Sequence, residues 1–198
     1  MERKYMETTK WSEHVILVQA DYVDRVAFDL SVNYERMLGR RIPKADLAHW
    51  LVCAALDGGV TPGANEIQVL LIHSKEKKQL DNFLPASFSQ ELDGKGFDDP
   101  HLGTFSISSL QVENLVSASE FFAQAFETLA DAKEVKNLIV VPDPEASVYD
   151  LMAIMDHVEG EKNVTLLTME PLNSKRFKND ILGYSLTSAL GVRGDEFK

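Results

Sequence analysis

The sequence predicts an α/β fold, a three-layer sandwich in which helices cover both faces of a mostly parallel sheet of about five strands. Three observations indicate this fold. Short apolar runs rich in β-branched residues alternate with stretches whose apolar residues fall at helical spacing. The segments between these runs are too long for hairpin turns, so right-handed crossovers are expected to join the strands. With 198 residues, 44% of them hydrophobic, the chain can bury one full core.

The first part of the chain predicts two strands and two helices. Residues 15–18 form a wholly apolar run, which is typical of a central strand buried on both faces. The helix that follows is expected to end at Gly39. Pro43 is expected to open the second helix, which the Asp-Gly-Gly sequence at 57–59 terminates. Residues 67–72 then predict the second strand.

The middle of the chain predicts two more strands with a helix between them. Residues 75–103 are rich in Lys, Asp, Gly, Ser and Pro, and they predict a long loop or a short helix. Residues 104–110 predict the third strand. Ser117 and Glu120 have the spacing of a capping box, so a helix is expected to begin after Ser117. Residues 138–141 predict the fourth strand.

The last part of the chain predicts one strand between two helices. Ser147 is expected to cap the first of these helices. Residues 164–167 predict the fifth strand, and 179–190 predict the final helix. These elements place a single α/β domain at residues 13–191.

The remaining segments and the composition narrow the possible functions. Residues 1–12 are expected to form an N-terminal extension and residues 192–198 a frayed tail. No run approaches the roughly 18 apolar residues of a membrane span, and no signal-peptide core is present, so no membrane association and a cytoplasmic location are expected. The formal net charge of −11 disfavours broad binding to the phosphate backbone of nucleic acids. No DNA-binding motif is present.

Acidic side chains follow two of the predicted strands. Asp21 comes after the first strand, and Asp143 and Glu145 come after the fourth. Because ligands bind at the carboxyl ends of parallel strands, these carboxylates are expected at one edge of the sheet. Mg²⁺ or Mn²⁺ commonly neutralises such a cluster and can activate water for phosphodiester hydrolysis. The structural alternative is that these acids only stabilise helix N-termini.

The same elements carry a resemblance to a known family. A strand ending near an acid, two helices, two strands, a helix and a strand followed by Asp143-Pro144-Glu145 resemble, over residues 13 to 170, the NYN branch of the PIN-like nucleases. The resemblance implies a PIN-like fold and a ribonuclease that acts on RNA with Mg²⁺ or Mn²⁺. It implies Asp21, Asp143 and Glu145 as catalytic residues and metal ligands, and Glu120 as a further ligand.

The chain departs from this family after its first strand, where Tyr22 stands in place of the family's Asn, Asp21 comes two residues later than the family's Asp, and the Asp itself is replaced. Gln19 stands where the family has its first-strand aspartate, and an amide is a poorer metal ligand than a carboxylate, so the resemblance implies a degenerate acidic site. The whole chain also resembles an uncharacterised bacterial family of similar length, and that resemblance implies no activity.

Two other functions remain open. The first is a non-catalytic protein-interaction or assembly module on the same fold. Gln19 and the lack of a complete motif favour it, and Phe28 on a nominally polar helix face would supply a contact in a homo-oligomer. The second is a small phosphate or nucleotide bound at the N-terminus of the helix that Ser147 is expected to cap.

Overall fold

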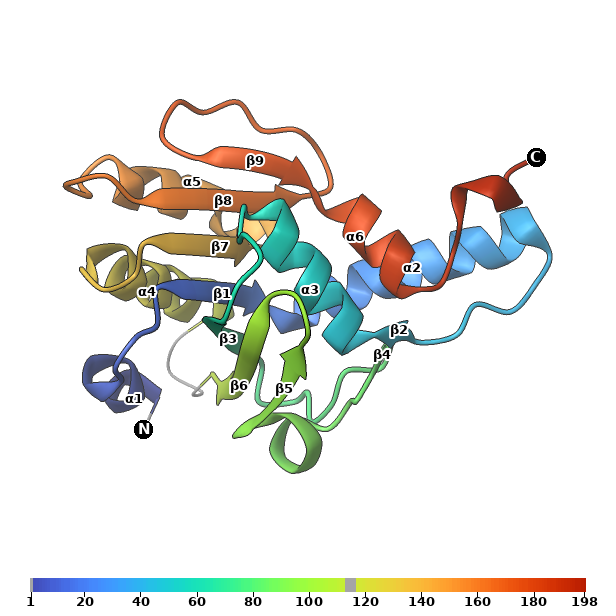
Figure 1. Cartoon of the computed structure of the whole chain (residues 1–198), viewed down its shortest axis with the longest axis horizontal. Coiled ribbons are helices and arrows are strands. Elements are labelled where there is room, and N and C mark those ends of the chain that lie inside the picture. Colours follow the sequence, from blue (N-terminus) through green and yellow to red (C-terminus); the bar gives the residue numbers. More distant parts are fainter. Residues whose placement is uncertain (1, 113–116) are drawn as a thin grey trace.

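The computed structural model describes residues 2–112 and 117–198, and these residues form a central sheet of seven strands (Figure 1). The strands lie in the order β5-β6-β3-β1-β7-β8-β9, and neighbouring strands are parallel except β5 and β6. Their bounds are β1 (His14–Gln19), β3 (Asn65–His73), β5 (Lys95–Asp99), β6 (Gly103–Gln111), β7 (Asn137–Val141), β8 (Asn163–Thr168) and β9 (Lys178–Ile181). A small separate sheet pairs β2 (Ala45–Asp46) with β4 (Phe83–Leu84). The predicted parallel sheet is confirmed, and β5 and β9 extend it at its two edges.

Helices cover both faces of the sheet. One face carries α2 (Ala20–Leu38), α3 (Leu47–Asp57) and α6 (Leu182–Ala189), and the other carries α1 (Glu2–Thr8), α4 (Ala118–Asp131) and α5 (Pro144–Met155). The side chains of strand β1 show that both faces of the sheet are covered. Ile16 and Val18 pack in the cluster of the first face, whereas Val15 and Leu17 pack in the cluster of the second. All four side chains are at most 1% exposed, so β1 lies between two helical layers and the three-layer sandwich is confirmed.

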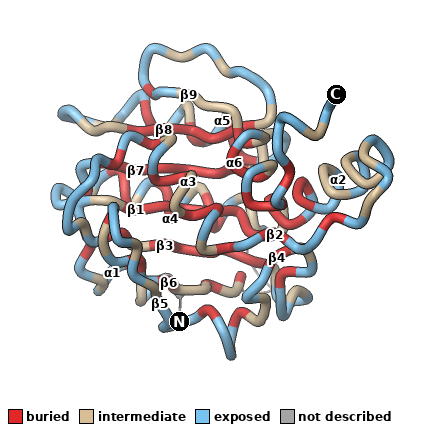
Figure 2. The backbone as a smooth tube through the Cα atoms, turned by 45° about the vertical axis from the view of Figure 1, so that its right-hand side comes forward, coloured by how far each residue is buried: buried red, intermediate tan, exposed pale blue. Residues whose placement is uncertain are grey.

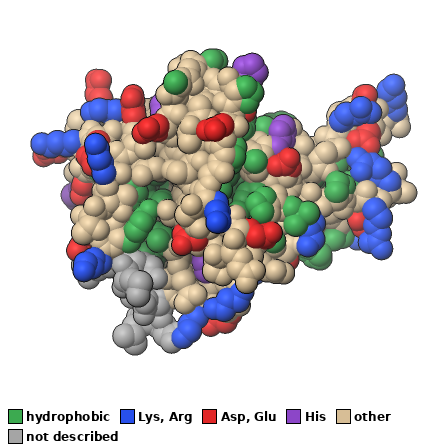
Figure 3. All heavy atoms as spheres, turned by 60° about the horizontal axis from the view of Figure 1, so that its bottom comes forward, with side chains coloured by type: hydrophobic (Ala, Val, Ile, Leu, Met, Phe, Trp, Pro, Cys, Tyr) green, Lys and Arg blue, Asp and Glu red, His purple; other side chains and the backbone are tan. Residues whose placement is uncertain are grey.

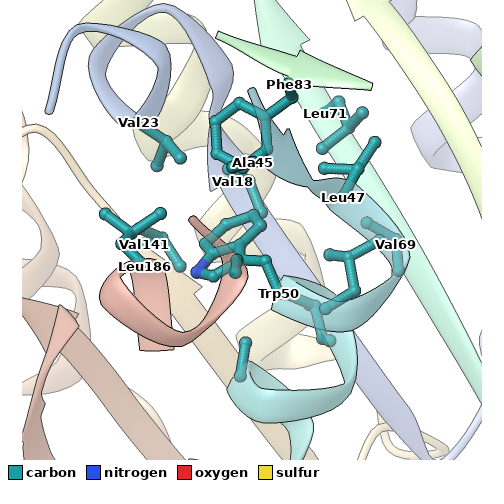
Figure 4. Packing of buried hydrophobic residues seen from close by; sticks show 14 of the residues in the cluster. Val18, Val23, Ala45, Leu47, Trp50, Val69, Leu71, Phe83, Val141 and Leu186 are labelled. Carbon is teal, nitrogen blue, oxygen red and sulfur yellow. The ribbon is translucent and has the colours of Figure 1, made fainter. Parts of the chain in front are cut away.

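The larger core lies between the sheet and the layer of α2, α3 and α6. Figure 4 shows Trp50 of α3 among apolar side chains from the strands and the neighbouring helices. Its Nε1–H donates to Ser185 Oγ of α6 at 3.2 Å, and its ring lies 5.7 Å from the ring of Phe83. Figure 2 shows that the buried residues follow the strands and the inward faces of the helices.

The starts of α3 and α6 differ from the prediction, as does that of α5, which begins at Pro144 and not after Ser147. Helix α3 begins at Leu47 rather than at Pro43, because Asp46 caps it and residues 45–46 form β2. The Asp46 side chain accepts a hydrogen bond from a backbone N–H of the first turn at 3.0 Å. The helix predicted over 179–190 is divided, because its first residues pair with β8 as strand β9 and the helix α6 follows.

Residues 75–103 contain more regular structure than the predicted loop or short helix. They include β4, a π-helix at Phe88–Leu92 and the antiparallel strand β5. The buried carboxylate of Asp24, 1% exposed, holds the start of this segment to α2. It accepts hydrogen bonds from the backbone N–H of Asn82 at 2.8 Å and from Lys77 Nζ at 2.7 Å.

The second half of α2 projects from the body of the protein (Figures 1 and 2). The buried residues of α2 all lie within 20–27, and Phe28 is 53% exposed. The tail at 192–198 packs along this projecting half, so the expectation of a frayed tail is wrong. Glu196 accepts a hydrogen bond from Arg40 Nε at 2.8 Å, and this ion pair fixes the tail. Figure 3 shows Lys and Arg side chains gathered at the tip of the projection.

The N-terminal residues also pack on the domain. Met6 and Trp11 are 5% and 6% exposed and belong to the apolar cluster of the second face, which includes α4. Within residues 2–112 and 117–198, no helix has both the length and the apolar composition to cross a membrane.

Candidate functional site

The strand order of the sheet changes direction at β1. From β1 the chain passes to β3 and β6 on one side, and it then returns to β7, β8 and β9 on the other side. The connections that leave the carboxyl ends of β1 and β7 therefore diverge. In open parallel sheets such a switch point forms a crevice in which ligands bind.

Two adjoining cavities lie at this switch point. The inner cavity has a volume of about 270 Å³, and the outer cavity has a volume of about 790 Å³. The residues that line both are Tyr22, Arg25, Asp143 and Ala146. Because they share these walls, we treat the two cavities as one switch-point site.

The side chain of Gln19 links the end of β1 to the start of α5 by hydrogen bonds. Its side chain is 7% exposed, and its Oε1 accepts hydrogen bonds from Asp143 N–H at 2.6 Å and from Ser147 Oγ–H at 3.2 Å. Ser147 is therefore a donor inside the first turn, and the prediction that it caps the helix is wrong. Asp143 is the cap, because its side chain accepts a hydrogen bond from the N–H of Glu145 in the first turn. Pro144 follows as the first helical residue, where its fixed backbone angle suits the helix and its missing N–H leaves no donor unpaired.

The phosphate alternative depended on free amides at this helix N-terminus. The Asp143 side chain accepts a hydrogen bond from Glu145 N–H at 3.2 Å, and the N–H of Asp143 itself binds Gln19. Both N–H groups thus have protein acceptors, so this helix end offers a phosphate fewer donors than the alternative requires.

Two residues that line the inner cavity, Gln19 and Asp21, each have a side-chain atom without a hydrogen-bond partner. Nε2 of Gln19 has no hydrogen-bond partner among the residues that the structure describes. Asp21 also lines this cavity, and its Oδ2 accepts the N–H of Ser74 at 3.1 Å. Its Oδ1 is buried and has no partner within the described ranges. A buried polar atom without a partner is rare because it costs about 1–3 kcal/mol, so the Oδ1 of Asp21 is the distinctive feature of the cavity.

Two polar aromatic side chains that line the site, His73 and Tyr22, are uncharged at neutral pH. His73 is 5% exposed and stacks on Phe88 with the ring centroids 3.8 Å apart. Burial lowers the pKa of its imidazole below the usual value, so the ring is neutral at pH 7. Partial burial, followed by the charge of Asp143, raises the pKa of the Tyr22 hydroxyl, which therefore keeps its proton.

The structure brings three of the four predicted site residues together. Asp21 and Asp143 line the inner cavity, and Asp143 and Glu145 line the outer cavity. Glu120 has a structural partner, because its carboxylate accepts the N–H of Ser117 at 3.2 Å in the predicted capping box, which is confirmed. Across the described residues, no group of three or more His, Cys, Asp and Glu side chains is arranged to hold a metal ion.

The sequence reasoning missed three residues of the site. His73, the last residue of β3, and Ser74, the next residue, line the inner cavity, and the rule that singled out the other strand ends would also have found them. Arg25 gave no signal in the sequence. It lies one helical turn after Asp21, its Nη2 is 3.4 Å from Asp143 Oδ2, and its guanidinium lies 5.5 Å from the ring centre of Tyr22.

Comparisons with known proteins place the chain in a family. No curated protein and no solved structure matches the chain significantly. A family model described as "Family of unknown function (DUF6621)" matches residues 8–197, which is nearly the whole chain. The chain therefore belongs to this family of unknown function.

Proposed function

We propose that the protein is a binding domain for a neutral, polar small molecule held in the switch-point site. The observation that carries this proposal is the unpaired pair in the inner cavity, Nε2 of Gln19 and Oδ1 of Asp21. A ligand with a carbonyl oxygen beside an N–H would accept from the first and donate to the second. Such a ligand would remove the cost of the unpaired Asp21 Oδ1 and would also give the Gln19 Nε2–H an acceptor.

The charge around the site favours a neutral ligand. The outer cavity is lined by four carboxylates and one guanidinium, namely Asp29, Asp143, Glu145, Glu170 and Arg25. With a net charge of −11 on the whole chain, this environment repels phosphate groups. Carboxylates do accept hydrogen bonds from sugar hydroxyls. A ribonucleoside, with its base edge in the inner cavity and its ribose in the outer cavity, has both features.

Binding of the four ribonucleosides and their 5′-monophosphates, measured by calorimetry, tests this function. We expect at least one nucleoside to bind, and to bind more tightly than its monophosphate. Asp21→Asn keeps an oxygen for Ser74 N–H but turns the unpaired acceptor into a donor, so we expect binding to weaken at least tenfold.

The matched control is Asp150→Asn, which removes one exposed carboxylate on α5 and should leave the affinity unchanged. The proposal fails if no nucleoside binds at millimolar concentration. It also fails if Asp21→Asn and Asp150→Asn bind the nucleoside equally well.

A Mg²⁺- or Mn²⁺-dependent ribonuclease is the second candidate. The PIN-like resemblance suggests it, and the observation in its favour is that Asp21 and Asp143 line one cavity. The carboxylates as placed do not fit a metal site. Asp143 caps α5 and faces Arg25, Asp21 binds Ser74 N–H, and Glu120 belongs to its capping box. We therefore derive no catalytic step through a metal.

Calorimetry with Mn²⁺ separates the two candidates. If the protein binds a neutral ligand as proposed, the Asp143→Asn variant should show no loss of Mn²⁺ binding relative to the unaltered protein. Mn²⁺ binding that this substitution removes, together with cleavage of RNA that requires the same carboxylate, would favour the ribonuclease.

Assembly into a homo-oligomer is compatible with either function. Its support is the exposed apolar surface of the projecting half of α2, where Phe28 and Met37 are 53% and 65% exposed. Light scattering after size-exclusion chromatography tests it, and a strictly monomeric protein would count against it.

A further inference from the structure

A third cavity, of about 510 Å³, lies between the C-terminus of α3 and the strands β8 and β9. Its lining includes Asp57, Thr165 and Asp180, one residue from each of these elements. Apart from Leu172, these walls are distinct from those of the switch-point site. The cavity is therefore a separate place to look for a ligand.

The strand register directs Thr165 toward this cavity. Thr165 pairs with Lys178, and Leu167 pairs with Asp180. Side chains that pair across strands, or that lie two residues apart in one strand, share a face of the sheet. Leu167 packs in the cluster of α2, α3 and α6, so Thr165 and Asp180 also face the α3 side. Thr165 is 2% exposed, and its Oγ1 has no hydrogen-bond partner in the described part of the chain.

The two carboxylates of the cavity, Asp57 and Asp180, repel each other. Asp57 also lies where a negative charge is unfavourable. Asp57 is the last residue of α3, whose last turn has no basic residue, so a negative charge meets the negative end of the helix dipole. Burial, and then the charge of Asp180, raises the pKa of Asp57 to about 6. Lys178 on the same face is exposed and forms no ion pair with either carboxylate. The cavity thus has an excess of negative charge and an unpaired hydroxyl.

We propose that this cavity binds the primary ammonium group of a small organic cation. The ammonium has three N–H donors, and the three acceptors come from Asp57, Asp180 and Thr165. A positive charge there relieves the repulsion between the carboxylates and complements the C-terminus of α3. The absence of a metal-type group of three or more His, Cys, Asp and Glu side chains among the described residues favours an organic cation over a metal ion.

Titration of the protein with n-propylammonium, followed by NMR of the side-chain carboxyl carbons, tests this site. We expect saturable shifts of the Asp57 and Asp180 signals and a fall in the titration midpoint of Asp57. Propanol, which lacks the charge, and tetramethylammonium, which lacks N–H donors, should give at most a tenth of the affinity.

Variants locate the binding. We expect Asp57→Asn and Asp180→Asn each to weaken propylammonium binding at least tenfold and Thr165→Val to weaken it about threefold. Asp150→Asn, with the same loss of charge on the opposite layer, should bind as the unaltered protein does. The proposal is overturned if propylammonium does not shift the two carboxyl signals at 50 mM, if tetramethylammonium or Mg²⁺ binds equally well, or if Asp57→Asn binds as tightly as Asp150→Asn. The measurement on the unaltered protein decides the question even if a variant fails to fold.

Discussion

Asp24→Asn is expected to lower the free energy of unfolding by about 3 kcal/mol, the largest effect that we expect from one side chain. The Asp24 carboxylate accepts backbone N–H groups from Asp81 and Asn82, at 3.0 and 2.8 Å, and the ammonium of Lys77 at 2.7 Å. Asparagine has one acceptor oxygen, so its NH₂ group would face the N–H of Asp81 and leave the ammonium of Lys77 with Asp81 as its remaining partner.

Chemical denaturation measures this loss, and amide exchange should show that residues 77–82 exchange faster. The control is Asp29→Asn, because Asp29 is an exposed carboxylate on the same helix, and its loss should change stability by less than about 0.5 kcal/mol. Equal stabilities of the two variants would show that the Asp24 contacts do not hold this segment.

Gln19→Met is expected to lower the free energy of unfolding by about 2 kcal/mol. Methionine keeps the length of the side chain but removes the acceptor that pairs with Asp143 N–H and Ser147 Oγ–H. The N–H at the start of α5 is then buried without a partner.

A second substitution separates this effect from simple loss of packing. Adding Ser147→Ala to Gln19→Met should cost less than Ser147→Ala costs alone, because the hydroxyl has already lost its acceptor. Thermal or chemical unfolding of the four proteins gives the coupling energy. Strict additivity of the two substitutions would contradict a hydrogen-bonded link between β1 and α5 at Gln19.

Much of the fold could be predicted from the sequence because the parallel strands are buried on both faces. The short apolar runs at 15–18 and 138–141, rich in β-branched residues, are typical of central strands, and they lie in β1 and β7. The edge strands β5 and β9 could not be found in this way. Their residues are mostly polar, because one side of an edge strand meets solvent, and partners elsewhere in the sheet decide their pairing.

The site could be located from the sequence but its chemistry could not. The strand-end rule places Asp21 and Asp143 correctly at one edge. It does not show what each side chain binds. Gln19, seen in the sequence as a lost metal ligand, has a structural partner in the backbone of Asp143. Asp57 and Asp180 were not singled out, because a helix end and an edge strand far apart in sequence meet only in the folded chain.

The most direct test of the switch-point site is the NMR signal of the Gln19 side-chain NH₂ group during titration with a nucleoside. This group is the unpaired donor of the inner cavity, so a ligand carbonyl that enters should shift the signal of the proton donated to it downfield. We predict a saturable shift in the unaltered protein that follows the calorimetric affinity and is weakened at least tenfold by Asp21→Asn. A nucleoside that binds while the Gln19 signals stay unchanged would contradict the account.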